Sequence, residues 1–139
     1  MYMNNFSRTV DMLHRAMDVT TLRYQVTANN LANSEVPNFK RSSVNFESML
    51  KRAIDSEAQA NDKIRLTATD ERHISPNPIM DYRDVQPRRV VDYLSTAKAN
   101  GNNVDAETEA MEVLKLQMSY QLLSQLQAFQ FSQIKTVMK

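Results

Sequence analysis

The first part of the chain carries an apolar seam that is typical of a long helix. From residue 6 to residue 31, apolar and small side chains recur at alternating steps of four and three, beside a second row at sevenfold spacing. The seam consists of Phe6, Val10, Leu13, Met17, Thr20, Tyr24, Thr27 and Leu31, and the flanking row of Met12, Val19 and Val26. Because Pro37 disfavours helical backbone at Val36, the pattern predicts a helix over residues 7–33.

The last third of the chain predicts a second long helix, over residues 105–139. Gly101 and the two asparagines after it break the preceding structure, and Asp105 is a good N-cap. Between Leu116 and Ile134, none of the 19 residues is charged. Six glutamines and three serines in that run would each need a hydrogen-bond partner in lipid, which argues against a membrane-spanning helix.

Two apolar stripes run along this second helix, and a single partner helix covers only one of them. The first stripe consists of Met111, Leu114, Met118, Leu122, Leu126 and Phe129, and the second of Val113, Leu116, Tyr120, Leu123, Phe131, Ile134 and Met138. We expect Leu13, Met17 and Tyr24 of the N-terminal helix to face the first stripe. The other stripe then needs a further surface, so the terminal helices are expected to fray in an isolated chain.

The middle of the chain has no long periodic pattern and contains three of the four prolines. Residues 44–54 favour a short helix, residues 63–67 alternate like a short strand, and residues 90–94 fit either state. So long an irregular span is improbable inside a small compact domain, so we expect an extended arm or a segment ordered by partners. The prediction is a mainly α fold and one folding unit, with a helix in 1–34, a junction and central arm in 35–104, and a helix in 105–139 paired with the first as a coiled-coil-like hairpin.

Composition and charge exclude several functions. A net charge of +1 argues against a strong nucleic-acid or anionic-membrane partner, which would need a concentrated basic face, and the absence of cysteine excludes thiolate metal sites. One glycine in the whole chain excludes a glycine-rich phosphate loop, while His14 and His73 have no further ligands at metal-binding spacing. We therefore expect no enzyme, cofactor, metal or small-molecule substrate. The nine methionines are either ordinary core filler or suited to helix faces that fit several neighbours.

Three segments resemble one family of bacterial proteins. Residues 28–41, ANNLANSEVPNFKR, are similar to the signature ANNxANxxTPGYK of flagellar axial proteins, with Val36 for Thr, Asn38 for Gly and Phe39 for Tyr. Residues 66–74, LTATDERHI, resemble the LxxTxxxHI element of proximal-rod proteins. Their C-terminal pattern is matched by residues 101–105, GNNVD, followed by Glu109, Tyr120, Gln121, Phe131, Ile134 and Lys135. The order of these segments across nearly the whole chain resembles the flagellar basal-body rod protein family.

This resemblance implies a structural subunit of the proximal rod that assembles helically around an export channel and transmits torque. The terminal helices would form an inner coiled-coil tube, with the middle of the chain outside them. The implied partners are copies of the chain, other rod proteins, the rod-base adaptor at the MS ring and the flagellar type III export gate. Export without cleavage into the periplasmic rod agrees with the charges at Arg8, Asp11 and Arg15, which interrupt any apolar signal segment. A soluble helical adaptor with one cytoplasmic partner is the competing function.

The residues that we expect to matter form three sets. Helix pairing and subunit contact are assigned to Val10, Leu13, Met17, Tyr24, Leu31, Leu114, Met118, Tyr120, Leu122, Leu123, Phe129, Phe131 and Ile134. The junction set is Asn29, Asn30, Leu31, Ala32, Asn33, Pro37 and Phe39; its asparagines either hydrogen-bond backbone at the helix end or on a neighbour, or are solvated amides on a frayed end. The polar set is Gln117, Gln121, Gln125 and Ser132, placed on the channel wall, in contacts between subunits or between packed helices.

Overall fold

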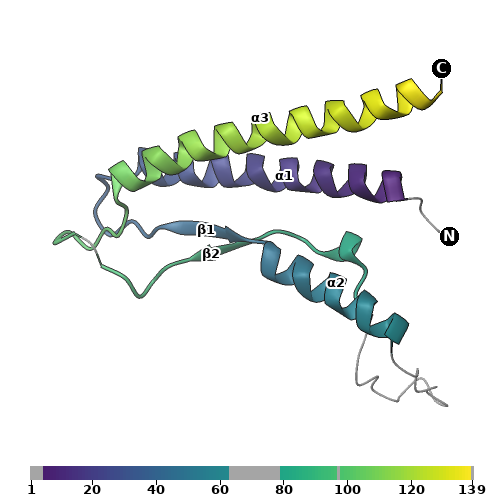
Figure 1. Ribbon diagram of the computed structural model, residues 1–139. Coiled ribbons are helices and arrows are strands. Elements are labelled where there is room, and N and C mark those ends of the chain that lie inside the picture. Colours follow the sequence, from purple (N-terminus) through teal and green to yellow (C-terminus); the bar gives the residue numbers. More distant parts are fainter. Residues whose placement is uncertain (1–4, 63–78, 97, 139) are drawn as a thin grey trace, which may run out of the picture. The chain divides into compact units, whose positions relative to one another are not determined.

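The computed structural model describes residues 5–62, 79–96 and 98–138. Long helices lie near both ends of the chain, and a shorter helix, one 3-10 turn and two strands come between them (Figure 1). In chain order the elements are α1 (Asn5–Ala32), β1 (Ser42–Asn45), α2 (Glu47–Asp62), η1 (Tyr82–Asp84), β2 (Arg88–Val91) and α3 (Ala106–Val137). The two strands pair as a small antiparallel sheet. The predicted mainly α fold with long terminal helices is confirmed.

The chain divides into two compact units. The first consists of residues 1–44 and 89–139, and the second of residues 45–88. The first unit therefore contains α1, α3 and most of the sheet, while the second contains α2 and η1. Folding of the whole chain in one step stays a prediction.

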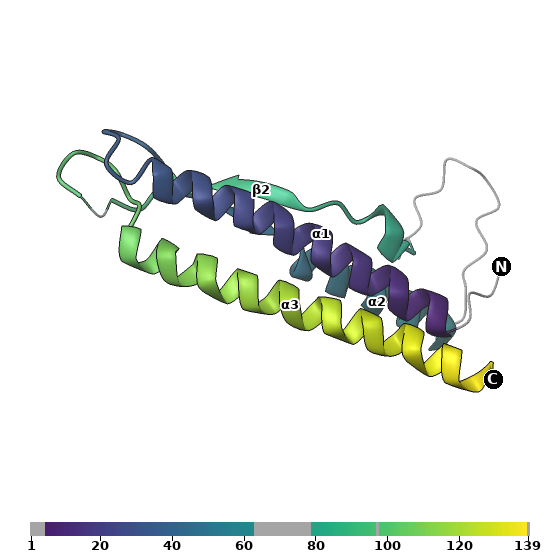
Figure 2. The ribbon, with the colours of Figure 1, turned by 90° about the horizontal axis from the view of Figure 1, so that it is seen from above.

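In the first unit, α1 and α3 lie side by side and run in opposite directions, as both views show (Figures 1 and 2). Phe6 packs edge-on against Phe131, with 5.9 Å between the ring centroids. Closer to the middle of both helices, the Nε2 atoms of His14 and Gln127 are 2.5 Å apart. Both contacts join the first half of α1 to the second half of α3, which confirms that the terminal helices pair.

The end of α1 follows the predicted junction closely. The amide of Asn33 donates to the carbonyls of Asn29 (3.2 Å) and Asn30 (3.1 Å), and the amide of Ser34 donates to the carbonyl of Leu31 (3.2 Å). The chain then continues in turns up to Pro37, which cannot donate a helical hydrogen bond. The helix therefore ends at Ala32, one residue before the predicted end.

The face of α3 that packs on α1 differs from the prediction. Leu116 is buried, and Val113, Leu123 and Ile134 on the same face are half-buried. The expected stripe is instead exposed: the exposed fractions are 60% for Leu114, 71% for Met118, 58% for Leu122 and 54% for Phe129. The pairing of α1 with that stripe is therefore wrong.

On α1, the buried apolar side chains come from the flanking row rather than from the seam. Val19 and Val26 are buried, whereas Tyr24 of the predicted seam is 39% exposed. Val10, Leu13, Met17 and Leu31 are only half-buried. Thr20 and Thr27 of the seam are buried next to Val19 and Val26. The buried face of α1 therefore lies between the seam and the flanking row.

The second unit is a small cluster around α2. The helix begins at Glu47, three residues after the predicted start, because the Asn45 side chain accepts a hydrogen bond from the Ser48 hydroxyl (2.7 Å) and Phe46 precedes the first turn as a buried side chain. Ser56 on α2 bonds the backbone of Met80 (Met80 N to Ser56 Oγ, 3.0 Å). Its buried apolar side chains are Phe46, Ala53, Tyr82 and Val85. The strand expected at residues 63–67, and His73, lie outside the described residues.

Candidate functional site: the junction and the outer face of α3

Asn30, in the last turn of α1, has a fully buried side chain. Its Oδ1 accepts from the amide of Ser42 (3.0 Å), while its Nδ2 donates to the carbonyl of Ser42 (2.8 Å) and to Oε2 of Glu109 (3.1 Å). The end of α1, the start of β1 and the start of α3 therefore meet at one side-chain amide. We call this region, residues 28–42 and 101–109, the junction. Both the nitrogen and the oxygen of the Asn30 amide have partners, as burial requires.

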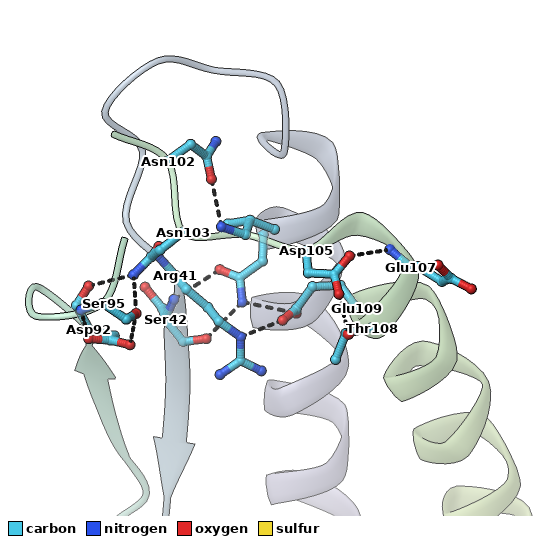
Figure 3. A network of polar contacts seen from close by, with 12 residues as sticks. Arg41, Ser42, Asp92, Ser95, Asn102, Asn103, Asp105, Glu107, Thr108 and Glu109 are labelled. Atoms are coloured by element: carbon cyan, nitrogen blue, oxygen red, sulfur yellow. Dashed lines mark hydrogen bonds and ion pairs between the residues drawn. The ribbon is translucent and has the colours of Figure 1, made fainter. Parts of the chain in front are cut away.

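Glu109, in the first turn of α3, places a carboxylate in the interior of the first unit. Its side chain is 1% exposed, and its Oε1 accepts from Nε of Arg41 at 2.5 Å (Figure 3). Arg41 itself is 37% exposed, so its guanidinium also reaches solvent. A buried carboxylate needs such a cation because dehydration costs more than one hydrogen bond returns.

Asn102, which is distant in sequence, hydrogen-bonds the backbone of the residues that follow α1. Its Nδ2 lies 3.0 Å from the carbonyl oxygens of Asn33 and Ser34 and 2.8 Å from that of Val36. Its Oδ1 accepts from the amide of Val104 at 2.6 Å. The last carbonyls of a helix lack partners within the helix, and here the fully buried Asn102 supplies one donor group for the residues that follow α1.

Two positions of the junction have left-handed backbone. Gly101 has φ of 79° and Asn38 has φ of 58°. A Cβ atom at Gly101 would lie 2.6 Å from Oδ1 of Asn38, so even a methyl group would force a shift. Asn tolerates this region better than most residues, which explains why Asn38 can stand where the flagellar signature has Gly.

Asp105 caps α3 as predicted. Its side chain accepts from the hydroxyl of Thr108 (2.6 Å) and from the amide of Glu107 (3.1 Å). The bond from Thr108, and then that from the Glu107 amide, lowers the pKa of the Asp105 carboxyl below its ordinary value of 3.8. This cap places Glu109 at a fixed point of the first turn.

A second feature is the exposed apolar face of α3. We call it the outer stripe, and it consists of Met111, Leu114, Met118, Leu122, Leu126 and Phe129, all of them exposed. Since α-helical residues are about 100° apart around the axis, the outer stripe lies on the side of α3 opposite to Leu116 and Leu123. Helical spacing puts Gln125 on the same side, between Leu122 and Phe129. The outer stripe therefore has no cover within the first unit.

Gln117, Gln121 and Ser132 share an adjoining side of α3. All three are exposed, and helical spacing places them next to the outer stripe. Two chemically different faces of α3, one apolar and one polar but uncharged, are thus directed away from α1. Their assignment to a channel wall or to subunit contacts stays a prediction.

The described residues show neither a cluster of metal ligands nor a membrane-spanning helix. They contain no group of three or more His, Cys, Asp or Glu residues that could hold a metal ion. None of the helices in the described ranges is long and apolar enough to cross a membrane.

No family model matches the chain. Among curated proteins it is 43% identical over 137 residues to one from Borreliella burgdorferi (strain ATCC 35210 / DSM 4680 / CIP 102532 / B31), covering 99% of this chain and 100% of that one. A protein of Borrelia hermsii is 42% identical over the same shares, and one of Bacillus subtilis (strain 168) is 30% identical over 98% of this chain and 97% of its own. All three are named flagellar basal body rod protein FlgB. This chain belongs to the FlgB family.

Membership of the FlgB family confirms the resemblance found in the sequence and identifies a structural protein of the flagellar basal body rod, not an enzyme. The structure also explains two of the motifs. The segment 28–41 and the segment 101–105 meet in the junction, where Asn102 donates to the carbonyls of Asn33, Ser34 and Val36 and the Arg41 amide donates to Oδ1 of Asn103. In this FlgB family member, both motifs build one structure within the chain.

The junction set was predicted only in part. Asn30 and Asn33 do bond backbone, Asn33 through a local bond from its Nδ2 to the Asn29 carbonyl (2.7 Å). Asn29 is exposed, and Phe39 is half-buried. The contact between Arg41 and Glu109 was not predicted, because the two residues belong to motifs that lie far apart in the chain. The helical spacing of Glu109 with Val113 and Leu116, on the buried face, is the signal that would have identified this carboxylate.

The two asparagines near the end of α1 should differ sharply in their effect on stability. Asn30→Ala removes three hydrogen bonds and leaves buried groups of Ser42 and Glu109 without partners, so we expect a loss of about 2–4 kcal/mol in the free energy of unfolding. Asn33→Ala removes one local bond and should cost less than about 1 kcal/mol. Denaturant unfolding of the purified chain measures both, and equal losses would contradict the role given to Asn30.

Proposed function

We propose that this chain is a subunit of the proximal part of the rod that assembles helically around the export channel through its terminal helices and transmits torque. Its partners are then copies of itself, other rod proteins, the rod-base adaptor at the MS ring and, during secretion, the type III export gate. It reaches the periplasmic rod without cleavage of a signal segment. Family membership supports a rod component, and the outer stripe of α3 supports assembly through the helices.

The outer stripe carries this proposal. Exposed apolar surface on this scale marks a contact site, because single exposed side chains are common but a continuous row along a helix is not. One side of α3 already packs on α1, so its opposite side requires a surface from another chain. A rod subunit surrounded by neighbours provides such a surface for every copy.

The uncharged face fits a channel wall or a polar contact between subunits. A fixed charge would bind oppositely charged segments of a passing chain, and an apolar wall would hold its apolar segments. Gln117, Gln121 and Ser132 do neither strongly, and all are exposed. Gln125 lies within the outer stripe, so we assign it to subunit contact rather than to the wall.

The distal halves of the helices should depend on assembly more than the junction does. Every buried side chain of α1 lies at Val19 or beyond, and the buried side chains of α3 are Glu109 and Leu116. In the isolated chain we therefore expect amide hydrogen exchange in residues 5–18 and 117–137 to be at least about tenfold faster than around the junction. Exchange should slow in assembled rods. Equally slow exchange throughout the free chain would favour a self-contained adaptor instead.

The proposed function is tested by deleting the coding sequence in the bacterium that produces the chain. We expect loss of rods and of motility, restoration of both by the wild-type gene, and recovery of the chain from purified basal bodies. A deletion strain that builds complete rods, or basal bodies that lack the chain, would refute the proposal.

A further inference from the structure

A turn that follows β2 carries two exposed apolar side chains. We call residues 92–95 the display turn. Its central residues are Tyr93, 74% exposed, and Leu94, 96% exposed, the most exposed large apolar side chain among the described residues. Single exposed apolar residues are common on protein surfaces. Two adjacent ones at the tip of a turn require an explanation if the turn is rigid.

The display turn is held by hydrogen bonds at both ends. Oδ1 of Asp92 accepts from the amides of Leu94 (3.0 Å) and Ser95 (3.1 Å), and the Ser95 hydroxyl donates to Oδ2. The side chain of Asn103, which is buried, donates to the Asp92 carbonyl (2.9 Å) and to Oγ of Ser95 (3.0 Å) (Figure 3). The Asp92 amide also donates to the carbonyl of Arg41 (2.9 Å). The turn is thus anchored to the junction rather than free in solution.

This anchoring gives the two side chains a fixed direction before any partner arrives. A preorganised turn loses little conformational entropy on binding, so more of its contact energy appears as affinity. Tyrosine is also among the residues most enriched in binding hot spots. The display turn therefore has the properties of a docking element.

The chain also carries a surface that suits this element. The first part of the outer stripe, formed by Met111, Leu114 and Met118, is exposed and contains two methionines, which adapt to irregular shapes. Within one chain the two surfaces do not cover each other, because both are exposed. Only another molecule can bring them together.

The charges beside the two surfaces are complementary. The display turn contains the carboxylate of Asp92. Beside Met111 and Met118 on α3 lies Lys115, whose side chain is 73% exposed and also pairs with Glu112. Opposite charges flanking an apolar contact favour one orientation of docking.

We propose that the display turn of one copy inserts Tyr93 and Leu94 between Met111, Leu114 and Met118 of a second copy. This inference rests on the proposed function and names the partner of the outer stripe. Because the two surfaces differ, each copy can bind one neighbour in front and one behind, which generates a ring or an open helix rather than a two-fold dimer. Two side chains bury far less than the roughly 800 Å² per partner of a stable pair, so the contact forms within the assembled rod and not between free chains.

Disulfide cross-linking in the rod tests this contact directly, because the chain contains no cysteine. The variant Leu94→Cys/Met118→Cys is produced beside the wild-type chain, and purified basal bodies are oxidised. We expect cross-linked products that contain this chain alone. The control Leu94→Cys/Gln117→Cys moves the second thiol about 100° around α3 and should give at least about tenfold less product.

A second variant provides a readout that needs no disulfide. Tyr93→Ser/Leu94→Ser alters only exposed side chains, so the purified chain should unfold at the wild-type temperature. Its recovery in basal bodies, in competition with wild type, should fall at least about tenfold, which corresponds to about 1.4 kcal/mol.

The outcomes separate this inference from the proposed function. Cross-links from Leu94→Cys to a different protein, or yields equal to those of the control, overturn the contact between copies. Normal recovery of the serine variant also overturns it. In each of these cases the presence of the wild-type chain in basal bodies leaves the proposed function standing, whereas its absence refutes both.

Discussion

Replacing Arg41 by methionine is expected to destabilise the purified chain by about 3–5 kcal/mol, because it leaves the Glu109 carboxylate buried without a cation. The partial exposure of Arg41 places the expected value toward the lower end of that range. Only the hydrogen bond from Asn30 would then remain for a side chain that is 1% exposed. The measurement is the midpoint and slope of denaturant unfolding.

A second substitution separates the effect of the buried charge from a general loss of packing. Adding Glu109→Gln to Arg41→Met should restore part of the lost stability, since a neutral amide needs no cation and its oxygen can still accept from Asn30. The matched control is Lys115→Met, which breaks the exposed pair of Lys115 and Glu112 and should cost less than about 1 kcal/mol. If Glu109→Gln makes the Arg41 variant less stable still, the assigned role of the carboxylate is wrong.

Placing a charge in the outer stripe should abolish assembly without unfolding the chain. Met118 is 71% exposed in the isolated chain, so Met118→Glu should change its stability by no more than about 0.5 kcal/mol. In the rod, the same carboxylate would be buried against a neighbour in every copy, at a cost of several kcal/mol each unless it finds a partner. We therefore expect folded, exported protein and no motility.

The adjacent residue provides the control for that variant. Gln117→Glu adds the same charge at a position about 100° around the helix, outside the outer stripe. Strains with Gln117→Glu should build rods, with an effect on export at most. Motile cells carrying Met118→Glu would show that the outer stripe is not buried in the rod, and loss of rods with both variants would show that the effect is not specific to it.

The sequence predicted the long helices well, because their signals are local. The N-cap at Asp105 and the stop before Pro37 each act within a few residues, and each was found where expected. The strands were not predicted as a pair. β1 is only four residues long, and its position depends on Asn30 and on β2, both distant in sequence.

The sequence pattern alone could not predict which side of α3 faces α1. The helix has apolar residues on two opposite sides, so hydrophobic spacing cannot decide which side faces α1. The choice agrees with Glu109, whose carboxylate is held by Asn30 and Arg41 and which shares a side of the helix with Val113 and Leu116. This polar contact, between residues 79 positions apart, lies on the side of α3 that carries Leu116. The stripe on that side is covered only in part, because Tyr120 and Phe131 are 45% and 49% exposed.

The central claim is that neighbouring subunits cover the outer stripe in the rod, and thiol labelling measures this directly. Met118→Cys should react rapidly with a maleimide in the free chain, since its side chain is exposed there, and slowly in purified basal bodies. Leu116→Cys, buried against α1, serves as the reference for slow labelling in the free chain. Labelling of Met118→Cys in basal bodies as fast as in the free chain would contradict the account.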